Sequence, residues 1–119
     1  MVKEVAFVAY YVRDMTRACR FYGEVIGLKR GAPFNDDWVE FEVGSATFAL
    51  DTTGEALGIA PGTSSGVAFE VDDIQAMRQR LLDAGVDATE VHEFPPCFAC
   101  FASDPDGNRF AIHQRKAQP

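Results

Sequence analysis

The second half of the chain repeats the plan of the first half, and this internal repeat constrains the fold more than any other feature. The apolar run AFVAYYV comes before Asp14 and an amphipathic segment, and the run SSGVAFEV comes before Asp73 and a second such segment. An aspartate directly after an apolar run is typical of a strand that leads into a helix, because its carboxylate accepts hydrogen bonds from the first helical turn. The repeat therefore predicts two similar α+β units.

The first half predicts a strand, a helix and a hairpin. We expect a buried strand over residues 5–12 and a helix that ends at Gly27, where a left-handed residue can close it. Apolar residues recur in this helix at spacings of three and four, namely Met15, Ala18, Cys19, Tyr22, Val25 and Ile26. After Leu28 the period becomes two, which predicts strands over residues 38–43 and 47–51 around a turn at Gly44.

The second half predicts the same order of elements. A strand over residues 66–71 leads into a helix that ends at Gly85, and we expect further strands over 86–91, 97–102 and 109–114. The buried stripe of this helix is expected to contain Ile74, Met77, Leu81 and Leu82. Residues 104–107, Asp-Pro-Asp-Gly, predict a tight hairpin turn, because proline presets one turn dihedral and glycine accepts a positive φ. Each half is therefore predicted to be βαβββ.

Length and charge limit the organisation and the partners. The 119 residues are expected to form one domain, with halves at about 1–51 and 65–116 and a connector over 52–64 that is rich in glycine and threonine. A net charge of −7 without a basic run argues against binding to nucleic acid or an anionic membrane. No apolar stretch approaches the ~20 residues of a membrane span, and no export signal is evident. With three cysteines, we expect a cytoplasmic protein without disulfides.

Three segments carry a resemblance to a known family: FVAYYVRDMTRACRFYGEVIGL, VAFEVDDIQAMRQRLLDAGV and DPDGNRFAIHQ. Together they resemble the vicinal oxygen chelate superfamily, which includes glyoxalase I, bleomycin-resistance proteins, fosfomycin-modifying enzymes and extradiol dioxygenases. The resemblance implies paired βαβββ modules that form an open half-barrel cup, and the cup holds a ligand or a metal. It also implies a homodimer, with the cup built either within one chain or across two.

The resemblance places the metal ligands of metal-dependent members at positions that hold Phe7, Gly66 and Ala111 here. None of these residues has a side-chain nitrogen, oxygen or sulfur atom, and a catalytic metal site normally needs three protein ligands. A fourth family position lies near Ala49 or Asp51, and one carboxylate alone would hold a metal weakly. We therefore expect no metal and no cofactor.

Strand parity predicts the lining of the cup, because residues two apart share a face of a sheet. The inward residues are expected to be Phe7, Ala9, Tyr11, Trp38, Glu40, Glu42, Gly66, Ala68, Glu70, Arg109, Ala111 and His113. The candidate ligand-binding residues among them are Trp38, Phe7, Tyr11, Glu40, Glu42 and Arg109. Such a lining suits a flat apolar ligand with a cationic or hydrogen-bonding group. Alternatively, Trp38 packs at a strand edge or a dimer contact, and the glutamates are solvated.

Two residues are candidate catalytic groups. His113 could act as a general base near neutral pH or serve as one metal ligand, and its alternative is a hydrogen-bonded structural role. Glu70 could also act as a base, and its alternative is a solvated surface position. His92 is expected near a loop with a structural role. Cys97 and Cys100 form a C-x-x-C pair, but residues three apart on a strand point to opposite faces, which argues against a redox or zinc site.

Three functions remain open from the sequence. The first is a metal-independent protein that sequesters an aromatic or cationic small molecule, which the missing metal donors favour. The second is a glyoxalase-like lyase, isomerase or dioxygenase with atypical or absent metal ligands, since one fold carries many chemistries. The third is an accessory domain that serves only for association.

Overall fold

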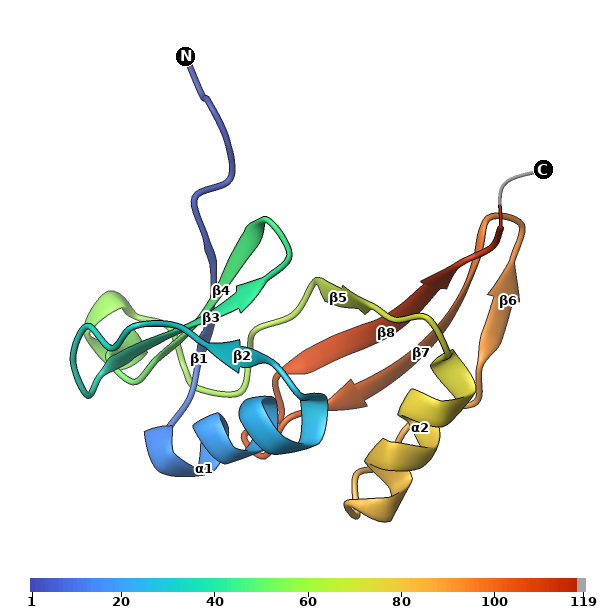
Figure 1. Cartoon of the computed structure of the whole chain (residues 1–119). Helices are drawn as coiled ribbons and strands as arrows, with labels where there is room; N and C mark the ends of the chain where they lie inside the picture. The colour runs from blue at the N-terminus through green and yellow to red at the C-terminus, as the bar shows by residue number, and fades with distance from the viewer. Residues whose placement is uncertain (118–119) are drawn as a thin grey trace.

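Two four-stranded mixed sheets form the molecule, and the computed structural model describes residues 1–117 (Figure 1). The first sheet has the strand order β1 (Val8–Tyr11), β4 (Ala46–Asp51), β3 (Trp38–Val43), β2 (Lys29–Arg30). The second sheet has the order β5 (Val67–Glu70), β8 (Arg109–Arg115), β7 (Cys97–Ser103), β6 (His92–Phe94). Strands β1 and β4 are parallel, as are β5 and β8, and the other neighbouring pairs are antiparallel. The predicted pairing of two α+β units with βαβββ order is confirmed.

Helices lie beneath both sheets, on the same side of the molecule (Figure 1). They are α1 (Met15–Arg20), the π-helix η1 (Phe21–Ile26) and α2 (Ile74–Asp83), whereas the short 3-10 helix η2 (Gly54–Leu57) lies beside the first sheet (Figure 1). Asp14 caps α1 through its bond from the Arg17 amide, and Asp73 caps α2 through its bond from the Ala76 amide, as predicted. Within residues 1–117, no helix combines the length and apolar character that crossing a membrane requires.

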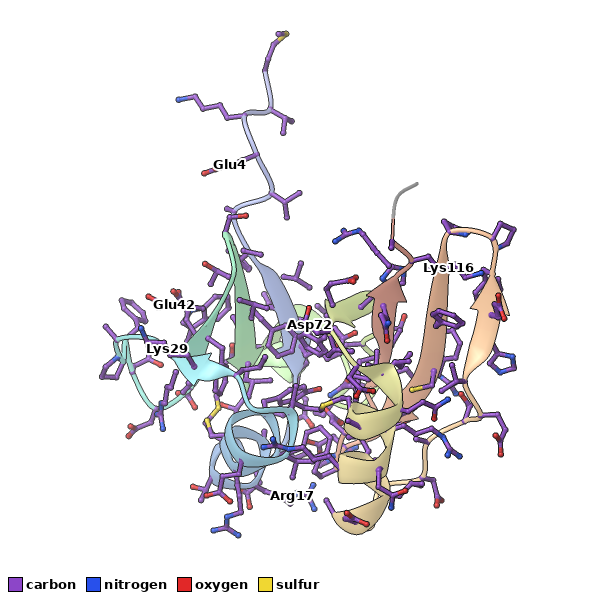
Figure 2. All side chains as sticks on the ribbon, turned by 45° about the vertical axis from the view of Figure 1, so that its right-hand side comes forward. Glu4, Arg17, Lys29, Glu42, Asp72 and Lys116 are labelled. Carbon is purple, nitrogen blue, oxygen red and sulfur yellow. The ribbon has the colours of Figure 1, made fainter. Side chains whose placement is uncertain are left out.

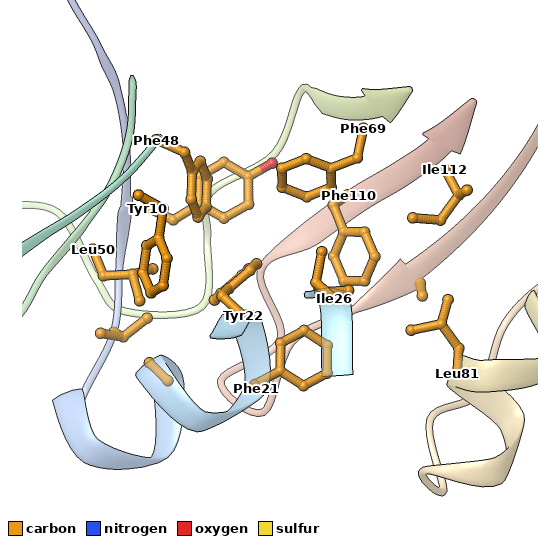
Figure 3. Close-up of a cluster of buried hydrophobic side chains, with 14 of the residues drawn as sticks. Tyr10, Phe21, Tyr22, Ile26, Phe48, Leu50, Phe69, Leu81, Phe110 and Ile112 are labelled. Atoms are coloured by element: carbon orange, nitrogen blue, oxygen red, sulfur yellow. The ribbon is translucent and has the colours of Figure 1, made fainter. Parts of the chain in front are cut away.

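One continuous cluster of buried side chains fills the space between the sheets and the helices (Figure 3). Tyr22 connects the halves, because its ring lies 4.9 Å from the ring of Phe48 in the first sheet and 6.5 Å from that of Phe69 in the second. Phe110 of β8 lies 5.9 Å from Phe21 of η1. Buried aromatic pairs of this kind add about 0.5–1.5 kcal/mol each beyond the area that they bury. The helix-facing sides of both sheets therefore share one core.

The turn between β7 and β8, in the second half of the chain, contacts the first half through Asp104. This carboxylate is buried and accepts from the Tyr22 hydroxyl at 2.8 Å, from the Asn108 side-chain amide at 2.9 Å and from two backbone N–H groups of the turn. Burial, and then the negative charge of Asp104, raise the pKa of Tyr22 far above its usual value. The Tyr22 hydroxyl is therefore a permanent donor to Asp104.

The connector is anchored by the same turn. Asn108 donates to the Tyr11 carbonyl at 2.9 Å and accepts from the Ser64 amide at 2.9 Å. Gly62 has φ 87°, and a Cβ there would overlap the carbonyl oxygen of Asp106, so only glycine allows this close approach. The expected glycine-rich connector is thus packed against the second hairpin, and it contains the short helix η2, which the sequence reading did not predict.

Several predicted elements differ from the structure. The first strand begins at Val8 rather than at residue 5, and Val5 is 78% exposed, so the expected burial of this end was wrong. Residues 1–7 carry no strand, and the arm before Phe7 extends away from the sheet, as Figures 1 and 2 show, with Glu4 labelled on it. Pairing with β4 begins only at Val8, opposite Phe48, and residues before it lie beyond the ladder.

The strand predicted over residues 86–91 was also wrong. This segment turns back from α2 and is held by Thr89, which donates from its amide to the Phe101 carbonyl and accepts from the Phe101 amide on its hydroxyl. Regular pairing starts at His92, opposite Ala99. Leu82 was expected in the buried stripe of α2 but is 37% exposed, because it lies one position past the core-facing Leu81. The helix predicted after Asp14 changes to a π-helix at Phe21.

Candidate functional site

Each sheet has one face turned away from the helices, which we call its open face. The cross-strand register decides which side chains lie there, since directly paired residues share a face. On the first sheet Trp38 pairs with Asp51 and Glu40 pairs with Ala49. On the second sheet the register pairs Ala68 with Ala111, Glu70 with His113, and Phe101 with Ala111.

An aromatic and acidic group occupies the first open face. The ring centroids of Phe7 and Trp38 lie 4.9 Å apart at an interplanar angle of 88°, and the Trp38 Nε1–H donates to Glu40 Oε2 at 2.7 Å. The Phe7 side chain is 49% exposed, and Trp38 is half-buried. The structure thus brings together three of the predicted ligand-binding residues, with the indole ring fixed by a hydrogen bond and an aromatic edge contact.

Two other predicted residues of this face are engaged elsewhere. Glu42 lies 3.6 Å from the Lys29 ammonium, and Figure 2 shows this pair at the outer edge of the first sheet. Tyr11 is covered by the connector, because a Cβ on Gly54 would come within 2.7 Å of its ring. Asp51 is buried, and its Oδ1 accepts from the amide and the hydroxyl of Thr53, both at 2.6 Å. Asp51 therefore stabilises the start of the connector.

Glu70 and His113 form an ion-pair group on the second open face. His113 Nδ1 lies 2.6 Å from Glu70 Oε1, and the Arg115 amide donates to Glu70 Oε2 at 2.8 Å. Partial desolvation raises the pKa of Glu70, but the Arg115 amide, His113 and the Arg115 side chain together outweigh it, so the pKa is lowered. The sequence suggested these two residues as separate candidates, and the structure places them in direct contact.

The contact fixes the tautomer of His113. An ionised carboxylate only accepts hydrogen bonds, so Nδ1 carries the proton that points to Glu70. In the neutral imidazole, Nε2 then carries the lone pair that can accept a proton. This arrangement can therefore accept a proton from a bound molecule or donate one to it.

A shallow apolar hollow of about 260 Å³ lies beside this pair. It is lined by Ser65, Gly66, Val67, Ala68, Phe101, Arg109, Phe110 and Ala111. Gly66 and Ala111 occupy two of the positions that the family resemblance assigns to metal ligands, and they supply a hydrogen atom and a methyl group. Phe7, at the third position, contacts Trp38. These residues do not fit a metal ion.

Other potential metal or redox residues are also separated. Across residues 1–117, no three histidine, cysteine or acidic side chains are arranged to hold a metal ion. Cys97 pairs with Arg115 on the open face, whereas Cys100 pairs with Ile112 on the helix face, and burial raises the pKa of Cys100. His92 is exposed at the start of β6, with its ring 6.3 Å from that of Phe101.

Phe101 is a lining residue that the sequence reading missed. Strand parity predicted inward residues on β5 and β8 only, whereas on β7 Cys97, Ala99 and Phe101 alternate with Phe98, Cys100 and Ala102. The register of the β7–β8 hairpin pairs Phe101 with Ala111, and this pairing would have predicted Phe101 as a lining residue.

Comparison with solved structures gives the same fold over nearly the whole chain. TnmS3, an antibiotic binding protein from Streptomyces sp. CB03234, is 24% identical, with a TM-score of 0.85 over 97% of this chain and 98% of that one. A glyoxalase/bleomycin resistance protein from the same Streptomyces strain is 25% identical, with a TM-score of 0.80 over 93% and 100% of the two chains. Lactoylglutathione lyase from Agrobacterium tumefaciens is 20% identical, with a TM-score of 0.78 over 95% and 94%.

Comparison with protein families gives the assignment directly. No curated protein sequence matches the chain. A family model matches residues 4–112, which include every strand of the first sheet and most of the second. The two βαβββ halves, their common strand order and this match lead to one conclusion: the chain belongs to the Glyoxalase/Bleomycin resistance protein/Dioxygenase superfamily.

Proposed function

We propose that this protein binds a small molecule with a flat apolar body on the open faces of its sheets, without a metal ion. The observation that carries the proposal is the apolar hollow around Gly66 and Ala111, two positions that the family resemblance assigns to metal ligands. Small residues there leave room for the body of a ligand, and Phe101 offers a ring for contact. Ligand sites in proteins are typically concave and mostly apolar in this way.

The first open face supports the same function. Trp38 is half-buried and held by Glu40 and Phe7, so a ligand can stack on it at little cost in side-chain entropy. Only one oxygen of Glu40 is bonded to the indole, and the carboxylate can also pair with a cationic group. A solved relative with this fold is described as an antibiotic binding protein, which is compatible with sequestration of a small compound.

We further propose that the protein is cytoplasmic and works as a homodimer. Within residues 1–117, no hydrogen bond or ion pair links the Phe7–Trp38–Glu40 group to the Glu70–His113 pair. A second copy that brings its first open face toward the second open face of its partner would enclose the ligand. Analytical ultracentrifugation at micromolar protein concentration tests this assembly, and a monomer throughout the range would contradict it.

Fluorescence of Trp38 tests ligand binding directly, since it is the only tryptophan in the chain. Titration with a panel of flat aromatic compounds should quench it saturably in the micromolar range, with and without a chelator. A Glu40→Gln variant should change the quenching, and a Glu42→Gln variant, at the edge of the sheet, serves as the matched control. Stoichiometric uptake of zinc, manganese, nickel or iron(II) that is needed for quenching would overturn the metal-independent function.

The contact between Glu70 and His113 supports a second candidate function, a metal-independent lyase or isomerase. In this reaction, on a substrate with a hydroxyl group beside its carbonyl group, His113 Nε2 takes the proton from the hydroxyl-bearing carbon, and the electron pair moves to the carbonyl oxygen to give an enediolate. The hydroxyl proton passes to that oxygen, the remaining oxygen forms the new carbonyl group, and Nε2 returns its proton to the former carbonyl carbon. Glu70 stabilises the imidazolium in between. Solvent deuterium should then enter a bound substrate in wild type and not in His113→Gln; equal incorporation in both proteins would exclude this role.

A further inference from the structure

We infer that the second open face selects ligands with an anionic group, which pairs with Arg109 while the flat apolar body lies in the hollow beside it. This inference rests on the proposed binding function and specifies the chemical class of the ligand. The occupant is an aromatic carboxylate or a similar planar anion. The placement of Arg109, the shape of the hollow and the distribution of charge lead to this assignment.

Arg109 has a fixed backbone and an exposed side chain. Its carbonyl accepts from the Tyr10 hydroxyl at 2.5 Å, and its amide donates to the Ser64 carbonyl at 2.9 Å. Among residues 1–117, no carboxylate lies within ion-pair distance of its guanidinium, whereas Arg13 and Arg17 both pair with Asp106. Arg109 therefore offers its planar donor group to a molecule outside the chain, and a guanidinium binds a carboxylate through two parallel hydrogen bonds.

The hollow places an apolar body next to this cation. Arg109, Ala111 and His113 alternate along one face of β8, and residues two apart in a strand lie about 6.5–7 Å from each other. Gly66 and Phe101 line the sides of the same space. A one- or two-ring body above Ala111 can therefore extend a carboxylate to Arg109 without leaving the sheet.

A larger cavity adjoins the hollow at Arg109. A cavity of about 710 Å³ between η1, the segment after α2 and the β7–β8 turn shares Phe101 and Arg109 with the hollow. Cavities of roughly 300–1,000 Å³ hold drug-sized ligands. A ligand of more than two rings can thus extend past Phe101 while its anionic group stays at Arg109.

The charge distribution separates the two open faces. The chain has a net charge of −7, so an anion binds only where a local cation offsets the general repulsion. On the first open face the free charge belongs to Glu40, whereas on the second the Glu70 carboxylate is already paired with His113 and Arg115. Arg109 is therefore the charge that a ligand in the hollow meets.

Three probes with the same body test the inference: naphthoate, naphthylmethylammonium and naphthalenemethanol, each titrated by calorimetry. The wild-type protein should bind naphthoate more tightly than the other two probes. The Arg109→Gln substitution should weaken the affinity for naphthoate about tenfold or more. Binding of the neutral alcohol should stay the same within about twofold. Arg109→Lys keeps the charge without the planar donor pair and should give an intermediate affinity for naphthoate.

Arg30→Gln, an exposed arginine on β2, is the matched control, and circular dichroism confirms that each variant is folded. An equal loss of naphthoate binding in both glutamine variants would overturn the inference, because it would reflect net charge alone. Tighter binding of the ammonium probe than of the carboxylate would also overturn it and leave the proposed binding function intact. Failure of all three probes to bind, together with no quenching of Trp38 by any compound of the panel, would contradict both.

Discussion

The two open faces of this molecule share a strand order and differ in chemistry. On the first sheet, Trp38 is fixed between Phe7 and Glu40, and the connector covers Tyr11. On the second, small residues leave a hollow between the exposed side chain of Arg109 and the Glu70–His113 pair. The two βαβββ halves therefore share an apolar, helix-facing core, whereas their open faces carry different side chains.

The two hairpin turns differ in the same way. The turn between β3 and β4 consists of the exposed Gly44 and Ser45, whereas the turn between β7 and β8 contains the buried Asp104 and Asn108. The second turn forms hydrogen bonds with the first half of the chain, through Asp104 to Tyr22 and through Asn108 to the Tyr11 carbonyl. The stability of the molecule should therefore depend on the second hairpin turn far more than on the first.

Replacement of Asp104 should have the largest effect. Asp104→Ala leaves the buried Tyr22 hydroxyl and the Asn108 amide without their acceptor, and we expect a loss of about 3 kcal/mol or more in the free energy of unfolding. Ser45→Ala in the first turn should change it by less than about 0.5 kcal/mol. Urea denaturation measures both, and similar values for the two variants would refute the contrast between the turns.

Replacement of two glycines with positive φ separates backbone strain from steric overlap. Gly62→Ala adds a Cβ that overlaps the Asp106 carbonyl oxygen, whereas Gly44→Ala, at φ 60°, adds a Cβ with nothing within 4 Å. Gly44→Ala should cost about 1 kcal/mol, and Gly62→Ala about 1–3 kcal/mol more, because the connector must move away from the turn. Thermal unfolding of both variants measures the difference, and an equal cost would show that the connector is not held closely there.

The smallest effect is expected at Glu70. Its folded-state pKa is lowered, so its stabilising contribution is present above the unfolded value near 4.5 and is lost as the pH falls through the folded value. Glu70→Gln should therefore cost less than about 1 kcal/mol at pH 7, since the side chain is partly exposed, and nothing once the pH lies below the folded value. Denaturation at both pH values, with Glu42→Gln as control, checks this, and a constant cost would exclude the electrostatic explanation.

The sequence predicted the features that local rules control. Asp14 and Asp73 begin helices, Gly27 ends one, and the alternation of Val39 and Phe41 with their neighbours defines the core face of β3, because caps and strand parity depend on a few adjacent residues. The βαβββ order of elements in each half and the family were also predicted correctly, from the repeat and its closing motif.

Features that depend on distant contacts were not predictable. Val86, Ala88 and Val91 alternate like a strand, but they pack against the core from an irregular segment, because the chain must first turn back from α2. The pairing of Glu70 with His113 requires the parallel register of β5 and β8, which periodicity alone does not give. Periodicity also does not predict that the connector covers Tyr11, because this contact depends on the close approach of Gly54 to the Tyr11 ring.

The hydrogen bond from Tyr22 to Asp104 joins residues that are 82 positions apart, and it has a consequence for synthesis of the protein. When the first half emerges from the ribosome, its strands and helices can already form, but Tyr22 still lacks its acceptor and Phe48 lacks the second-half ring of Phe69. The nascent chain must therefore keep an aromatic surface uncovered until its last hairpin has been translated. During that interval the first half is in the condition in which incompletely folded chains are prone to aggregate.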